Sequence, residues 1–139
     1  MKKKINSNGS INNLHSLLTK GMTTIKDLHN MADLLGFKID WIGFGNDFKE
    51  SNGKLQILNL GSWKNQSHWV GVNTESKIYF DPLGAPPDNY IPKDYKHYDL
   101  PIQNMNYGRC GQYVNLFLFY SNRGELDEFF DLFKIGYNE

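Results

Sequence analysis

The chain has 139 residues, one cysteine and a formal net charge of zero from 15 basic and 15 acidic side chains. This length suits one compact domain with its own core. The balanced charge gives no electrostatic reason for tight, nonspecific binding to nucleic acid or membrane. A lone cysteine forms no internal disulfide, so the fold must be able to work in a reducing compartment.

Residues 1–22 are predicted to form a flexible N-terminal tail before a single domain at residues 23–139. Lys2–Lys4 are the one basic cluster. A polar stretch, Ile5–Asn13, follows them rather than an apolar one, which argues against a secretory signal peptide. No stretch approaches the length of a membrane span. We therefore expect no membrane partner.

The domain is predicted to begin with one amphipathic helix. Thr23 and Thr24 offer a cap, apolar residues follow at helical spacing, and Gly36 ends the helix. These apolar residues are Ile25, Leu28, Met31, Ala32 and Leu35.

Strands are predicted next at Phe37–Phe44 and Leu55–Leu60. The intervening Gly45–Lys54 is rich in glycine, asparagine and charge, which indicates a loop. Gly61–Ser67 is expected to be a polar connection.

The next two strands, His68–Val72 and Lys77–Asp81, are predicted to form an antiparallel hairpin. With a turn centred between positions 74 and 75, the numbers of paired residues sum to 149. His68 then stands directly opposite Asp81, with Cβ atoms about 4.5–5.5 Å apart on one face. A loop with one residue more or fewer would turn the two side chains to opposite faces.

The rest of the chain is predicted to hold a loop, a short strand and two helices. Pro82–Pro92 contains four prolines and is expected to be a stiff surface loop. His97–Leu100 is a short strand candidate. Cys110–Ser121 is apolar on all sides, as in a helix buried in the middle of a domain. A last helix, Glu125–Lys134, is expected to bury Leu126, Phe129, Phe130 and Phe133.

Cys110 lies at the expected start of the buried helix. Aligned backbone dipoles and unpaired N–H groups at such a position favour the thiolate over the neutral thiol. With His68 and Asp81, the residues of a thiol-based acyl transfer are present: Cys110 attacks a carbonyl, His68 moves protons and Asp81 orients the imidazole. The N–H of Cys110 and the side chain of Gln103 are candidate donors to the oxyanion.

Each of these residues also has a structural interpretation. A lone cysteine such as Cys110 is more often a small buried hydrophobe. His68 alone is more often a half-buried strand residue, and Asp81 before a proline is more often a turn initiator. It is their combination that favours chemistry.

The roles of the remaining candidate residues are less closely defined by the sequence. A loop glutamine such as Gln103 generally meets solvent, and Asn104 or Asn106 is an alternative donor. Trp69, expected on the hairpin face opposite His68, is suited to core packing. No group of His, Cys, Asp and Glu has the spacing of a metal site, so neither a metal nor another cofactor is expected.

The motifs then carry a resemblance to adenain, the adenovirus maturation protease family, and to its relatives that process ubiquitin-like proteins. The order of histidine, acid, glutamine and cysteine is that family's order. The resemblance covers about residues 24–120, with fainter similarity at its upstream end. It is carried by His68-Trp69, Tyr79-Phe80-Asp81-Pro82-Leu83-Gly84, Gln103 and Cys110-Gly111, and faintly by Thr24–Leu28 and Ile42–Phe48.

The resemblance implies an α+β fold with a papain-like cysteine protease core in permuted His-Asp-Gln-Cys order. A mixed β-sheet would pack against a central helix that starts at the nucleophile. His68, Asp81, Gln103 and Cys110 would be catalytic, and the indole of Trp69 would wall a substrate channel.

By the same resemblance, the chain would be a monomeric cysteine endopeptidase that cleaves viral capsid or core precursors at glycine-containing sites during virion maturation. It would act in the virion and in the host cytoplasm or nucleus, and would not be secreted. Alternatives are a deubiquitinase-like or deSUMOylase-like isopeptidase, and a noncatalytic capsid-associated module of the same fold.

Three departures from the family qualify these expectations. Adenain-type enzymes are longer, which favours a small viral, virophage or transposon-borne member here. The adenovirus enzyme is activated by a peptide held through a disulfide, for which this chain has no spare cysteine, so any peptide or DNA activator would bind noncovalently, or there is no activator. Asp81 follows His68 more closely than is usual, which predicts a tighter hairpin.

Overall fold

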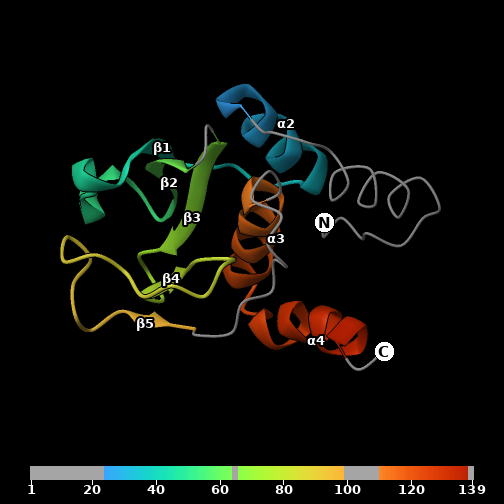
Figure 1. Cartoon of the computed structure of the whole chain (residues 1–139). Helices are drawn as coiled ribbons and strands as arrows, with labels where there is room; N and C mark the ends of the chain where they lie inside the picture. The colour runs from blue at the N-terminus through green and yellow to red at the C-terminus, as the bar shows by residue number, and fades with distance from the viewer. Residues whose placement is uncertain (1–23, 64–65, 99–109, 138–139) are drawn as a thin grey trace.

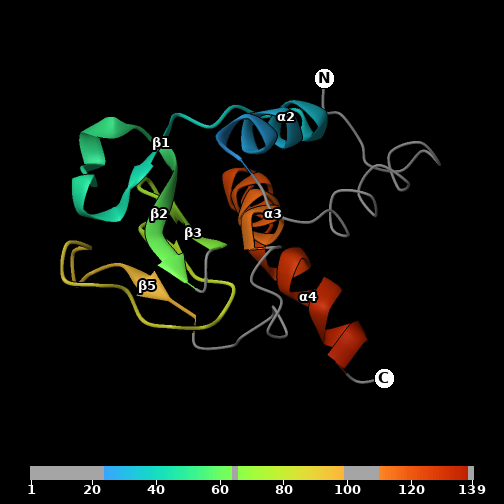
Figure 2. The same ribbon diagram turned by 45° about the horizontal axis from the view of Figure 1, so that its top comes forward.

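The computed structural model describes residues 24–63, 66–98 and 110–137, so the predicted tail lies outside the described residues. Within the described ranges the fold is α+β, with a mixed five-stranded sheet in the order β1-β2-β3-β4-β5 and three α-helices. The strands gather on one side of the molecule and the helices on the other (Figure 1), and the turned view in Figure 2 shows the same division.

The sheet combines parallel and antiparallel pairs. The β2-β3-β4 portion is antiparallel, while β1 runs parallel to β2 and β5 runs parallel to β4. The strands are β1 (Trp41–Phe44), β2 (Leu55–Trp63), β3 (Gln66–Asn73), β4 (Ile78–Phe80) and β5 (Lys96–His97), and the helices are α2 (Ile25–Leu35), α3 (Cys110–Asn122) and α4 (Leu126–Tyr137).

Helix α2 forms as its caps predict. The Thr24 hydroxyl accepts from the N–H of Asp27 and the Asp27 carboxylate accepts from the N–H of Thr24, both at 3.1 Å, which is a complete capping box. Gly36 ends the helix in the left-handed conformation with φ 87°. Of the five apolar residues at helical spacing, four are buried and Ile25 is 52% exposed.

The predicted strand limits need correction in several places, and the strand predicted at Lys77–Asp81 is the shorter β4, Ile78–Phe80. The strand predicted to start at Phe37 starts only at Trp41, and the predicted loop Gly45–Lys54 contains two short 3₁₀ turns, η1 (Gly45–Asp47) and η2 (Glu50–Asn52). The predicted polar connection Gly61–Ser67 is wrong, because β2 and β3 run into it. Strand β5 is Lys96–His97 rather than His97–Leu100, whose last two residues lie outside the described ranges.

The hairpin register is also corrected. Strands β3 and β4 pair Gly71 with Phe80 and Val72 with Tyr79, so paired numbers sum to 151 rather than 149. His68 is therefore not directly opposite Asp81. Because the shift is by two residues, the two side chains still point to one face, as diagonal neighbours within reach of each other.

Helix α3 packs directly on β3, beside which it lies in Figure 1. Gly71 allows the close approach, because a Cβ there would lie 2.9 Å from a methyl of Val114 and 3.1 Å from the ring of Phe117. From Cys110 to Val114 the helix rises about 6 Å, and from Trp69 to Gly71 the strand rises about 6.6 Å. Helix and strand therefore advance together, and the start of α3 lies over Trp69.

A separate apolar cluster covers each face of the sheet. One apolar cluster joins Trp69 and Phe80 to the helices, with Phe80 stacked on Phe117 at 4.9 Å and edge-on to Phe129 at 5.3 Å. The other cluster lies on the opposite face and includes Leu58, Val70, Val72, Tyr79, Ile91 and Tyr95. The last helix begins one residue later than predicted, and the side chain of Phe133 lies outside the described residues.

Candidate active site

The structure brings His68 of β3 and Asp81 together. The Nε2 atom of His68 lies 3.0 Å from Oδ1 and 3.1 Å from Oδ2 of Asp81. The Asp81 side chain is 1% exposed and that of His68 is 13% exposed. Asp81 Oδ1 also accepts from the N–H of Leu83 at 2.8 Å. The Leu83 N–H thus holds the Asp81 carboxylate in place, and the carboxylate in turn orients the His68 imidazole through its contact with Nε2.

Strand β4 ends at Phe80, directly before this aspartate. In the observed register the residue opposite Trp69 would be Pro82, which has no N–H to donate to a sheet. The N–H of Trp69 instead donates to Sγ of Cys110 at 3.2 Å. The Cys110 sulfur therefore contacts β3 just beyond the end of β4, at the residue that follows His68 in the chain.

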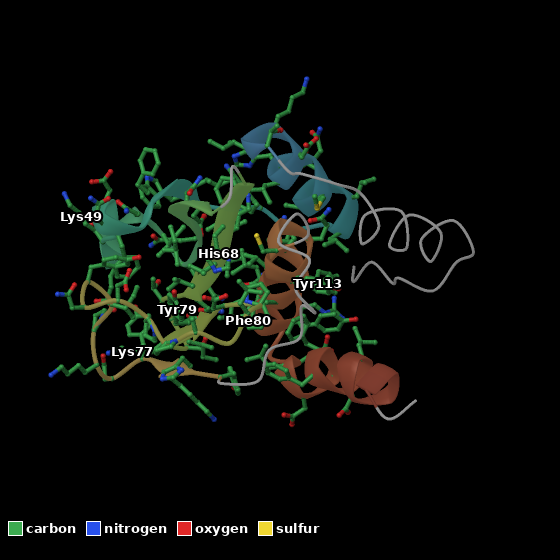
Figure 3. All side chains as sticks on the ribbon, in the orientation of Figure 1. Lys49, His68, Lys77, Tyr79, Phe80 and Tyr113 are labelled. Atoms are coloured by element: carbon green, nitrogen blue, oxygen red, sulfur yellow. The ribbon has the colours of Figure 1, made fainter. Side chains whose placement is uncertain are left out.

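Figure 3 shows His68 on β3, next to the first turns of α3. Burial lowers the pKa of His68, but its hydrogen bond to Asp81 and its interaction with Cys110 outweigh burial and raise the pKa to about 9. His68 is therefore an imidazolium at neutral pH. Its Nδ1 is buried and has no hydrogen-bond partner in the described part of the chain. With Nε2 committed to Asp81, Nδ1 is the nitrogen that remains for proton transfer.

Cys110 is the first residue of α3 and is 1% exposed. Its sulfur lies at a helix start and interacts with the His68 imidazolium. A substrate carbonyl must nevertheless displace covering atoms before it reaches Sγ. The low exposure of Cys110 is equally typical of a structural cysteine.

Of the other predicted site residues, Trp69 is described by the structure and Gln103 is not. Gln103 lies outside the described residues, as do the alternatives Asn104 and Asn106. Trp69 is 4% exposed and packs in the core cluster that also contains Cys110, which agrees with a packing role for the indole. Its role as a channel wall stays a prediction.

Sequence reasoning missed one contributor, the main-chain N–H of Trp69. Because this donor is a backbone group, no side-chain pattern reveals it. The available signal was Pro82, which cannot donate to a sheet and marks the end of the neighbouring strand at Phe80, so β4 has no residue opposite Trp69.

No family model, no curated protein and no solved structure matches the chain. Among residues 24–63, 66–98 and 110–137, no cluster of three or more His, Cys, Asp and Glu side chains is placed to hold a metal ion. In the same part of the chain, the helices are too short or too polar to cross a membrane.

Proposed function

We propose that this protein is a cysteine endopeptidase of the adenain type with a papain-like core. The observation that carries the proposal is the meeting of three segments. The Cys110 sulfur at the start of α3 accepts from the Trp69 N–H, beside His68, whose Nε2 contacts the buried carboxylate of Asp81. Nucleophile, base and orienting acid are grouped as acyl transfer requires.

The reaction follows from these positions. The Cys110 thiolate attacks the scissile carbonyl, and the Cys110 N–H at the helix start is aimed where the oxyanion forms. The His68 imidazolium gives its Nδ1 proton to the leaving amine, and the neutral imidazole then takes a proton from the water that hydrolyses the thioester. Asp81 stabilises the imidazolium in both halves of the reaction.

The substrate class rests on the resemblance in sequence. It favours cleavage of viral capsid or core precursors at glycine-containing sites, by a monomer acting in the virion and in the host cytoplasm or nucleus. A noncovalently bound peptide or DNA activator belongs to the same proposal. An isopeptidase acting on ubiquitin or a related modifier is the enzymatic alternative, and a modifier-derived fluorogenic substrate compared with a short peptide separates the two.

The test is cleavage of a peptide with glycine on both sides of the scissile bond. Wild-type protein should cleave it, iodoacetamide should block cleavage, and Cys110→Ala and His68→Ala should abolish it. His29→Ala is the matched control, because His29 is an exposed histidine on α2, and it should cleave at the wild-type rate. Cleavage that survives in Cys110→Ala would overturn the proposal.

The burial of Cys110 favours one noncatalytic alternative, a module in which the thiol is inert. Alkylation against pH distinguishes the two. A free thiol has a pKa of about 8.5 and reacts slowly at pH 6, whereas a thiolate paired with His68 keeps reacting there. Alkylation that requires denaturant at every pH would favour the inert module.

A further inference from the structure

A pocket of about 270 Å³ opens on the face of the sheet opposite α3. Three segments line it: the end of β1 with η1, the irregular stretch of β2, and the proline-rich loop that follows β4. The stretch of β2 is Asn59–Gly61, where Gly61 has φ 100° and the pairing with β3 shifts. Nothing in the catalytic arrangement uses this pocket.

The pocket is linked to both members of the His68–Asp81 pair. Asn59 pairs with Trp69 and Ser62 with Ser67, so Leu60 and Gly61 face His68 across the β2–β3 ladder. Neighbouring strands lie about 4.8 Å apart. From Asp81, the chain runs seven residues to Asp88 and nine to Tyr90, which also line the pocket. Because the Trp69 N–H contacts the Cys110 sulfur and Asn59 pairs with Trp69, the β2 part of the pocket lies beside the strand that carries the candidate active site.

The lining has one formal charge, the carboxylate of Asp88, and it is negative. Burial and then the charge of Asp88 raise the pKa of Tyr90 to about 12, so its phenol stays protonated and hydrogen-bonds to that carboxylate. The lining also includes the apolar side chain of Leu60 and the ring of Phe44, which is 61% exposed although it is large and apolar.

This combination fits a long side chain with an apolar stem and a cationic end. The methylenes of an arginine would pack on Leu60, as basic side chains commonly place their stems on apolar surface. Its guanidinium would pair with Asp88 and lie on the Phe44 ring, which arginine does better than lysine. A glutamate in the substrate would instead meet the Asp88 carboxylate.

Resting on the proposed protease function, we propose that this pocket is a substrate-specificity site for an arginine close to the scissile bond. Asp88 recognises the charge and Phe44 the planar guanidinium. Gly45 admits the Tyr90 side chain to the lining, because a Cβ at that position would collide with the Tyr90 hydroxyl. The site selects among substrates and takes no part in bond cleavage.

The experiment measures kcat/KM for glycine-site peptides that carry arginine, glutamine or glutamate at each position flanking the cleaved bond. At one position the wild-type protein should prefer arginine over glutamine by about tenfold, the effect of one partly exposed charge pair. Asp88→Asn should remove this preference through KM, with kcat retained. Phe44→Leu should reduce it about threefold.

Asp94→Asn is the matched control, since Asp94 is an exposed aspartate of the same part of the chain and lies outside the pocket. It should keep the preference. Asp88→Lys should reverse it, so that glutamate is favoured over arginine at the same position. A purely structural role for Asp88 would not produce that reversal.

The two proposals fail in different ways. If peptides are cleaved in a Cys110-dependent manner with no preference for arginine at any position, or if Asp88→Asn keeps the preference, the specificity site is overturned and the protease stands. If the wild-type protein cleaves none of the peptides, both are overturned. Melting temperatures of the Asp88 variants equal to wild type exclude misfolding as the cause.

Discussion

The two ends of β4 each carry an ion pair, and the pairs differ in surroundings more than in length. Before the strand, Lys77 Nζ lies 2.6 Å from Asp94 Oδ2, with side chains 51% and 56% exposed. After the strand, His68 lies 3.0 Å from Asp81, with side chains 13% and 1% exposed. The shorter pair is in water, where solvent and salt screen it.

Burial therefore distinguishes the two ends of β4, and we expect the buried pair to contribute more to stability and to the proposed chemistry. Breaking an exposed pair returns two charges to water at little cost, whereas breaking a buried pair leaves a charge without a partner. The exposed pair raises the pKa of Lys77 and lowers that of Asp94, but neither change alters a charge near neutral pH. At the buried end, the pKa of His68 moves across the physiological range.

The largest expected effect is on activity. Asp81→Asn keeps the shape of the side chain but removes its charge, so the imidazolium loses its stabilising partner. We expect kcat/KM for peptide cleavage to fall about 10³-fold or more, while Asp94→Asn stays within about twofold of wild type. Equal losses in both variants would mean that the buried pair has no special role in cleavage.

The next largest expected effect is on the free energy of unfolding, which should differ between variants at the two ends of β4. Asp81→Ala removes the partner of His68 and the acceptor of the Leu83 N–H, and is expected to lower the free energy of unfolding by about 3 kcal/mol. Asp94→Ala should leave urea denaturation unchanged. Coincident denaturation curves for Asp81→Ala and wild type would show that Asp81 contributes chemistry without stability.

The pairing of His68 with Asp81 was predictable from sequence because strand geometry depends on parity. The turn has the predicted length but is centred one residue later, which changes the sum of paired numbers by two, and an even shift keeps both side chains on one face. The capped helix α2 and the start of α3 at Cys110 were predicted for similar reasons, since both depend on local spacing and caps. In these places short-range chemistry decides the structure.

Features that depend on tertiary packing were not predictable in this way. Strand β2 continues through Gly61 to Trp63 and β3 starts at Gln66, which requires a shift in the β2–β3 pairing between Asn59 and Ser62. The sequence of one strand alone does not reveal this shift. The approach of Cys110 to the Trp69 N–H depends on Gly71 admitting α3. The pocket, likewise, joins three segments distant in sequence, so its charge and shape become visible only in the folded chain.

The pH dependence of stability should also come from the buried end. The folded-state pKa of His68, about 9, exceeds its ordinary value of 6.5, so the folded state binds the proton more tightly. The resulting stabilisation is fully present below pH 6.5 and is lost as the pH rises to about 9, for a total of about 3 kcal/mol. Urea denaturation across this range checks it.

Two histidine variants sharpen that measurement. His68→Gln should flatten the profile between pH 6.5 and 9, because it removes the titrating group. His29→Gln changes an exposed histidine and should keep the wild-type profile. A wild-type profile that is already flat would place the His68 pKa near its unfolded value and remove the energetic distinction between the two ends of β4.

The smallest effect concerns the share of Cys110 in the His68 titration. Asp81 raises the pKa of His68 more than Cys110 does, so Cys110→Ala should lower that pKa only in part, leaving it between 6.5 and 9. NMR titration of the imidazole C–H resonances in Cys110→Ala and wild type measures the difference. Asp94→Ala, at the exposed end of β4, should leave the titration unchanged. An unchanged His68 pKa in Cys110→Ala would mean that sulfur and imidazole do not interact. The buried ion pair would then orient a histidine that serves no nucleophile.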